Sequence, residues 1–284
     1  MIALLLAAWA NDARPAILIP SKVCNPVGRP SGPVSVGLLP GRLGNTVDPC
    51  VRTEAGIAVG GGLLVDTPDF YGRIQAFGAL DVRVGLSERV ELHGRFEGFR
   101  LDNVIAPVAV SASGIGATSI GMTVVLEQSL DHVISAHGQV VLPTQPHVNA
   151  APLALDAGMT AARAVKNGDL HGGVAVYGQG MLGRGPSAGK AALSGRIGTT
   201  QRITKTGLAF VLDAPLSVGW TGGFDHLGLA GAFRFGTGRV GDPTPDGESP
   251  DGRGLYGELG VMAPLFGRER TLAALELKIG ARFR

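Results

Sequence analysis

Hydrophobic and polar residues alternate along residues 74–100, IQAFGALDVRVGLSERVELHGRFEGFR. Even positions carry apolar residues and glycine, whereas odd positions carry most of the charged residues. A period of two is typical of a β-strand, so this stretch predicts two strands and a turn. If residues 87–89 form the loop, Asp81 faces Arg95 and Arg83 faces His93. A two-residue loop would instead set polar residues against apolar ones.

Each strand of this hairpin has about eleven residues, which fits a membrane-spanning strand. At ~3.3 Å per residue and a tilt of ~40°, such a strand rises about 28 Å. That height is close to the ~25 Å apolar band of an outer-membrane barrel. One face of the hairpin is apolar and the other carries mixed charge.

The alternation recurs to the end of the chain. A first strand is expected at residues 56–66, and apolar residues occupy even positions in both 120–126 and 134–142. The turn at residues 129–131 between these two runs has the three residues that this parity requires. The sequence therefore predicts an all-β fold, a single antiparallel transmembrane β-barrel of about 12 strands over residues 53–284.

A change of parity marks the next hairpin. Apolar residues are odd-numbered in 153–159 and even-numbered in 170–176, and such a switch requires a two-residue loop. Asn167-Gly168 is a preferred type I′ hairpin turn. This loop would place Met159 opposite Val176, Asp156 opposite Gln179 and Gly158 opposite Tyr177.

Two later hairpins follow the same reasoning. A loop at Thr204-Lys205 sets Arg196 opposite Asp213, and a five-residue loop at 266–270 sets Glu258 opposite Lys278 and Tyr256 opposite Gly280. Opposite charges on facing positions favour these registers. One connection fits poorly, because the Gly/Pro/Asp-rich stretch 237–254 falls on the side of the short turns, where barrels rarely keep long loops. The strand assignment near residues 220–226 stays open.

The period alone does not say which face meets water. A soluble sandwich would bury the apolar face, whereas a membrane barrel turns that face to lipid and the polar face to its lumen. Long, uniform strands and paired charges favour the barrel. The lumen-lining residues are then Asp81, Arg83, Glu91, His93, Arg95, Glu97, Arg196, Asp213, Glu258, Glu276 and Lys278. These charges either fill a narrow interior or line a conducting path, and both interpretations stay open.

Composition supports many strands and turns, with 45 glycines, 18 prolines, 45% hydrophobic and 17% charged residues. No window has the ~18 apolar residues that a transmembrane helix needs, so a membrane crossing has to use strands. A net charge of +2 without a basic run argues against a nucleic-acid partner. Aromatic residues make up 5%, which is low for a barrel with two aromatic girdles.

The first 52 residues differ from the rest. Residues 1–10, MIALLLAAWA, are interpreted as a short signal peptide, with a buried N-terminal strand as the alternative. Residues 11–52 are rich in proline and predict an irregular extension. Cys24 and Cys50 are the only cysteines and predict a disulfide in an exported protein. A metal site lacks further ligands, and the residues before Cys24 do not suit a lipid anchor.

Two stretches carry a resemblance to known proteins. The C-terminal LELKIGARFR resembles the last strand of bacterial outer-membrane proteins, which the barrel-assembly machinery recognises by a terminal aromatic residue; here Arg284 follows Phe283. Gly85–Leu92 matches a Gly-Leu-x-x-Arg-x-Glu-Leu turn, and Leu142–Thr144 matches a strand ending in Leu-Pro-Thr. Both motifs resemble the outer-membrane family of meta-pathway phenol degradation operons. That resemblance implies a channel-like barrel for small, aromatic or poorly soluble compounds, and it implies no catalytic residues.

Candidate chemistry is sparse. The six histidines, His93, His132, His137, His147, His171 and His226, form no metal-binding pattern, and a hydrogen-bonding role in the lumen is expected. Ser135 and His137 share a face but lack an acidic or amide partner for nucleophilic catalysis. We therefore expect no enzyme and no cofactor. The sequence predicts a passive channel in the outer membrane of a Gram-negative cell, in contact with outer-membrane lipid. The alternative is a non-conducting barrel that anchors a multi-protein envelope assembly, with periplasmic or outer-membrane partners.

Overall fold

The computed structural model describes residues 21–24, 49–66, 71–106, 109–142, 144, 151–166, 168–182, 190–202, 209–219, 223–236, 254–267 and 269–283. Within these ranges the chain is antiparallel β-sheet apart from one 3-10 helix, η1 (Lys22–Cys24). None of its helices there is long and apolar enough to cross a membrane. The prediction of an all-β antiparallel fold is confirmed. The predicted signal peptide and most of the extension fall outside the described residues.

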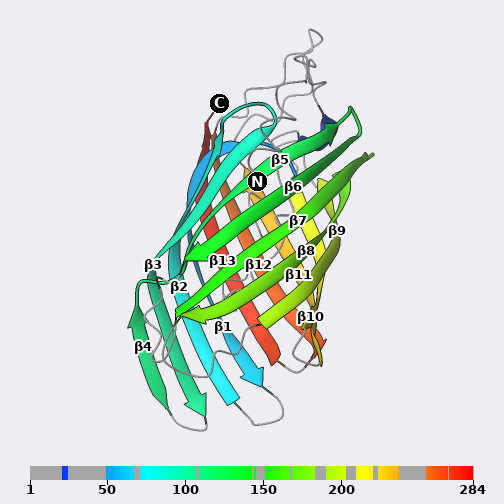
Figure 1. Cartoon of the computed structure of the whole chain (residues 1–284). Coiled ribbons are helices and arrows are strands. Elements are labelled where there is room, and N and C mark those ends of the chain that lie inside the picture. The colour runs from blue at the N-terminus through cyan, green and yellow to red at the C-terminus, as the bar shows by residue number, and fades with distance from the viewer. Residues whose placement is uncertain are drawn as a thin grey trace.

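The strands form one sheet of thirteen, in which the neighbours follow the chain order (Figure 1). Besides its neighbour β2, the first strand pairs with the last. With β4 set aside, each of the other strands has a hydrogen-bonded neighbour on both sides. The strands are β1 (Thr53–Asp66), β2 (Tyr71–Gly85), β3 (Val90–Ala106), β4 (Val110–Gly114), β5 (Thr118–Gln128), β6 (His132–Leu142), β7 (Ala151–Val165), β8 (Gly168–Leu182), β9 (Lys190–Arg202), β10 (Ala209–Gly219), β11 (Gly223–Gly236), β12 (Gly254–Gly267) and β13 (Glu269–Phe283).

The short strand β4 continues the line of β5 along β3. Arg100 pairs with Gly114, and Phe96 pairs with Thr118, which is the same register. Between them, the Gly116 amide donates to the Glu97 carbonyl and the Glu97 amide donates to the Ala117 carbonyl. No strand was predicted here, although VSASG alternates Val110 and Ala112 with two serines over a short stretch. In Figure 1, β1–β4 extend beyond the ends of β5 and β6.

Several predicted registers are confirmed. Asp81 pairs with Arg95 and Arg83 with His93, as the three-residue loop requires. Across the other two hairpins that were predicted correctly, Ile120 pairs with Val140, Glu258 with Lys278 and Tyr256 with Gly280.

Two predicted registers are wrong by two residues. Val165 pairs with Gly168, so Met159 lies opposite Val174, Asp156 opposite Tyr177 and Gly158 opposite Ala175. Similarly, Arg196 lies opposite Pro215 and Asp213 opposite Gly198. A shift of two positions leaves every side chain on its original face, so alternation cannot detect it. The region near residues 220–226 adds no separate strand to the described sheet, since β11 begins at Gly223. Most of the long stretch 237–254 falls outside the described residues.

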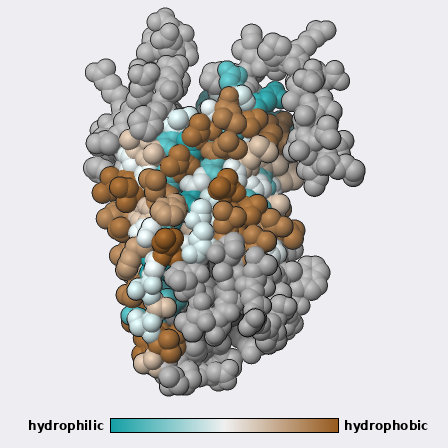
Figure 2. Space-filling model, turned by 60° about the vertical axis from the view of Figure 1, so that its left-hand side comes forward, coloured by the Kyte–Doolittle hydropathy of each residue, from teal (hydrophilic) through white to brown (hydrophobic). Residues whose placement is uncertain are grey.

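The two faces of the sheet differ in polarity as a membrane barrel requires. On the outer face Leu80 is 45% exposed, and Leu92 and Phe96 are exposed to a similar extent. Arg83 on the opposite face is only 6% exposed and Glu91 only 1%. Figure 2 shows apolar side chains over much of the described surface. We call the buried face the inner face.

Candidate functional site

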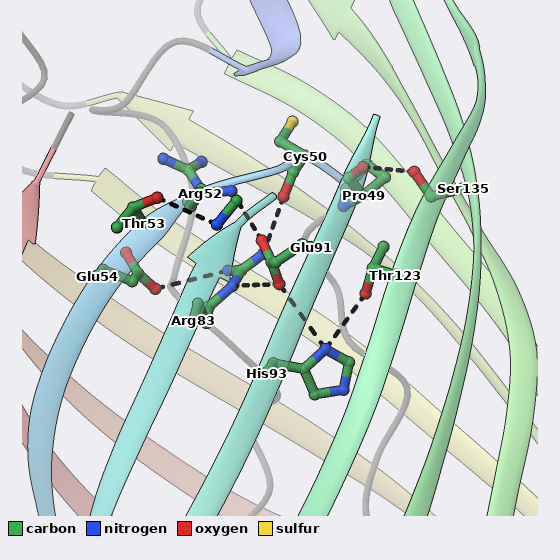
Figure 3. Close-up of polar contacts among 11 residues, drawn as sticks. Pro49, Cys50, Arg52, Thr53, Glu54, Arg83, Glu91, His93, Thr123 and Ser135 are labelled. Atoms are coloured by element: carbon green, nitrogen blue, oxygen red, sulfur yellow. Dashed lines mark hydrogen bonds and ion pairs between the residues drawn. The ribbon is translucent and has the colours of Figure 1, made fainter. Parts of the chain in front are cut away.

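The inner faces of β1, β2 and β3 form a wall of ion pairs, which we call the charged wall. Arg83 binds Glu91 with both ends of its guanidinium, Nε to Oε1 at 2.8 Å and Nη2 to Oε2 at 2.9 Å. Glu54 lies 3.5 Å from Arg83 Nη1 on the other side (Figure 3). Such paired, planar contacts are among the stronger charge-assisted hydrogen bonds. Arg83 therefore holds three strands together near the turn between β2 and β3.

A second cluster continues this wall. Arg95 lies 3.6 Å from Asp81 and 3.7 Å from Glu97, and its guanidinium stands 4.9 Å above the Phe77 ring. Arg100 donates to Glu97 at 2.8 Å. Beyond it, Gln75 accepts a bond from Arg100 Nη2 and donates to Asp102. The wall thus contains two clusters of ion pairs, one around Arg83 and one around Arg95 and Arg100, and the second extends through Gln75 to Asp102.

The N-terminal extension contacts the end of the charged wall. Arg83 Nη2 donates to the Cys50 carbonyl at 2.9 Å, and the Arg52 amide donates to Glu91 Oε2 at 2.7 Å (Figure 3). Ser135 donates from β6 to the Pro49 carbonyl. These bonds hold residues 49–52, just before β1, against the inner faces of β2, β3 and β6.

An apolar contact holds the other part of the extension. Val23 and Cys50 pack on three apolar inner-face residues, Val125, Val133 and Ala162. The predicted Cys24–Cys50 disulfide is present, with the two Cα atoms 5.5 Å apart. The Lys22 amide also donates to the Leu130 carbonyl in the β5–β6 turn at 2.9 Å. The disulfide therefore joins two segments that are both bound at the turn end of the strands.

The inner faces of β5–β8 form a second wall, which we call the polar wall. Its buried polar residues are small or neutral apart from two aspartates and include no lysine or arginine: Ser119, Thr123, Ser135, His137, Gln139, Asp156, Thr160, Asp169 and His171. Gln139 donates to Asp156 Oδ2 at 3.0 Å, and His171 contacts Asp169 at 2.9 Å. No partner contacts either ring nitrogen of His137, Oδ1 of Asp156 or the hydroxyl of Thr160 among the described residues.

His93 connects the two walls. Its Nδ1 lies 3.8 Å from Glu91 Oε1 and 3.5 Å from the Thr123 hydroxyl. The ring crosses Gly121, where a Cβ atom would meet His93 Nε2. This placement fits the hydrogen-bonding role that the sequence analysis expected of the histidines.

The structure describes the side chains of some predicted lumen residues and only the backbone of others. Arg83, Glu91, Arg95 and Glu97 are buried together, with Asp81 and His93 half-buried beside them. For Arg196, Asp213, Glu258, Glu276 and Lys278 only the backbone register is described, and it places them on the inner face in line with Glu54 and Gly280. No set of three or more His, Cys, Asp or Glu among the described residues could hold a metal ion.

The sequence analysis missed several buried residues of these walls. Arg100 and Asp102 have even numbers, which the alternation assigned to the outer face. A bulge in β3 reverses the parity there, since Ala79 pairs with Glu97 but Gly78 pairs with Phe99. Gly98, a glycine inside the strand, is a local signal of this bulge.

Comparisons with solved structures place this arrangement among known folds. An outer-membrane channel from Pseudomonas putida F1 superposes with a TM-score of 0.54 and 12% identity, over 82% of this chain and 96% of that one. The chain has the fold of a bacterial outer-membrane β-barrel. The β domain of the Bordetella autotransporter BrkA gives a TM-score of 0.52, again at 12% identity, over 82% of this chain and 100% of that one.

The translocator domain of the autotransporter NalP from Neisseria meningitidis is also similar. It gives a TM-score of 0.50 at 9% identity, over 83% of this chain and 88% of that one. No family model and no curated protein sequence matches the chain. The similarity therefore concerns the fold, which hosts channels and secretion domains alike.

Proposed function

We propose that the protein is a passive channel for small solutes in the outer membrane, built as a closed barrel of the twelve strands other than β4. One observation carries the proposal: charged and polar residues are buried on the inner face, while apolar side chains such as Leu80 and Phe96 are exposed outside. In water this arrangement would leave an apolar outer surface without a partner. Lipid acyl chains supply that partner, and the polar interior suits water and solutes.

Strand length and pairing support the membrane-spanning barrel. The strands other than β4 have 11 to 17 residues, enough for tilted strands to span the ~25 Å apolar band. The pairing of β1 with β13 leaves neither strand with an open edge, and an unpaired edge in lipid would cost several kcal/mol per exposed backbone group.

In this proposal the N-terminal extension restricts the turn end of the channel. Residues 49–52 are held by Arg83, Glu91 and Ser135, and Val23 is held by apolar inner-face residues. The sequence analysis left filling and conduction open for the interior charges. The ion pairs of the charged wall support a structural role for that wall, and the polar wall is then the side along which solutes pass.

The test combines localisation with conductance of the full-length chain. We expect the protein to fractionate with outer membranes, to show heat-modifiable gel migration and to conduct ions in planar bilayers. A Cys24→Ser/Cys50→Ser variant should show larger or more frequent openings, because the extension is then bound only by noncovalent contacts. Reduction of the wild type provides a matched control for the two substitutions.

Two results would contradict the proposal. Silence of both the wild type and the double serine variant in bilayers would argue against a channel. Stoichiometric copurification of periplasmic proteins with such a silent barrel would favour an envelope anchor instead. A protein found only in soluble fractions would refute the membrane barrel itself.

A further inference from the structure

Two buried aspartates of the polar wall differ in how they are paired. Asp156 on β7 and Asp169 on β8 are each 3% exposed. Asp169 contacts the His171 ring at 2.9 Å. Asp156 receives one bond from the neutral Gln139 amide, and no cationic side chain of the described residues contacts it. Its second oxygen therefore lacks a partner, which is costly for a buried carboxylate.

Further unpartnered groups lie beside Asp156. His137 pairs across the sheet with Gly158, and Thr160 occupies the next inner-face position of β7. Both side chains are more than nine-tenths buried, and neither His137 nitrogen nor the Thr160 hydroxyl has a partner among the described residues. Inner-face positions repeat every two residues, so Asp156 and Thr160 stand roughly 13 Å apart with His137 between them. Native proteins rarely leave so many neighbouring buried polar atoms unsatisfied.

We propose that Asp156, His137 and Thr160 form a solute-binding station for a small hydroxylated amine in its ammonium form. The inference rests on the proposed channel function and names a solute class for it. An ammonium group supplies positive charge and three donors to the Asp156 carboxylate. A neutral imidazole and a hydroxyl each donate and accept, so His137 and Thr160 suit the hydroxyl groups of the same solute.

Two carboxylates of the charged wall do not offer an amine a comparable site. Glu91 is already bound by Arg83, and Glu97 by Arg100. An amine that approached these carboxylates would have to displace a buried guanidinium. At Asp156 it would displace no cationic side chain of the described residues.

The experiment measures binding of three probes to the folded full-length protein by isothermal titration calorimetry in detergent. Glucosamine, glucose and glucuronate have similar size and carry positive, neutral and negative charge. We expect glucosamine to bind about tenfold or more tightly than glucose, because hydrogen bonds between charged partners exceed neutral ones by that amount. Glucuronate should bind most weakly.

Matched variants separate the station from general electrostatics. Asp156→Asn should abolish the preference for glucosamine over glucose. Thr160→Val should weaken the binding of all three probes. Asp169→Asn removes the same charge from the same wall and should keep the preference. Heat-modifiable migration confirms that each variant is folded, and Gln139→Leu provides a second route to alter Asp156 if Asp156→Asn fails to fold.

Three outcomes would overturn the station: no detectable binding, equal binding of glucosamine and glucose, or an unchanged preference in Asp156→Asn. An unfilled station would mean that ordered water satisfies these groups. Bilayer recordings test the channel separately from the station. A preference for glucosamine that is lost in Asp156→Asn would support the station even if the protein did not conduct.

Discussion

The charged wall of β1–β3 and the polar wall of β5–β8 both bury polar side chains, but they differ in how their charges are paired. In the charged wall Arg83, Arg95 and Arg100 each contact a carboxylate within the wall. In the polar wall His137 and Thr160 have no partner among the described residues. A buried charge that loses its partner is expensive, whereas a polar group without one can receive it from water or a solute. The difference separates a wall held by ion pairs from a wall in which some polar groups contact no other described residue.

The largest expected effect comes from breaking the charged wall. Arg83→Met leaves Glu91 and Glu54 without their shared cation and should reduce the free energy of unfolding by about 3–5 kcal/mol. Urea unfolding in lipid vesicles, followed by gel migration, measures the change. Arg83→Met/Glu91→Met is the control and should lose less than the single variant, because it removes both charges of the bidentate pair. Equal losses would show that the ion pair does not stabilise this wall.

A smaller effect is expected where the two walls touch. A Cβ atom on Gly121 would come within 2.6 Å of Gln139 Cβ and 2.7 Å of the Gly138 carbonyl, and it would meet His93. Gly121→Ala should therefore cost about 1–3 kcal/mol by overpacking. A Cβ atom on Gly78 would have no neighbour within 4 Å, so Gly78→Ala should be nearly neutral. The same urea titration compares them, and a neutral Gly121→Ala would place His93 elsewhere.

The polar wall itself should tolerate loss of an unpartnered group. Thr160→Val replaces a buried hydroxyl with a methyl group of similar shape and should leave the free energy of unfolding unchanged or raise it by up to about 1 kcal/mol. Ser135, its neighbour across β6 and β7, donates to the Pro49 carbonyl. Ser135→Ala should instead lose about 1 kcal/mol. Similar losses in both variants would mean that Thr160 is bound as tightly as Ser135.

The smallest effect belongs to an ion pair outside both walls. Lys22 and Asp131 lie 3.3 Å apart with side chains 62% and 58% exposed. Lys22→Ala should lower the free energy of unfolding by less than about 1 kcal/mol, and 1 M salt should remove the difference. The loss caused by Arg83→Met should persist in the same salt. A salt-resistant effect at Lys22 would require a further contact of its amine.

Local alternation predicts the faces of this sheet well and the registers less well. Leu80 and Arg83 fall on the predicted faces because a strand repeats every two residues. Asp156 was expected opposite Gln179, yet it pairs with Tyr177 and contacts Gln139 on the other neighbouring strand. A shift of two residues changes such partners without moving any side chain to the other face.

Long-range contacts had no local signal at all. The bond from Arg83 to the Cys50 carbonyl joins residues 33 positions apart, and Cys50 lies at the end of a proline-rich segment whose path alternation cannot predict. Likewise, Arg100 and Asp102 belong to the charged wall only because the bulge in β3 turns them inward. The sequence predicted the polar character of the interior but could not separate the ion-paired wall of β1–β3 from the polar wall of β5–β8.

The seam between β1 and β13 runs from Thr53 with Phe283 to Asp66 with Glu269. It joins the earliest strand of the sheet to the latest, so it has the greatest sequence separation of all the pairings, and such non-local pairing is slow to form. Until residues 269–283 have been synthesised, the edge of β1 that pairs with β13 has unpaired backbone N–H and C=O groups. Such an edge can pair with another chain and start aggregation. The protein is therefore most prone to aggregation before β1 pairs with β13, and less so once the sheet has formed.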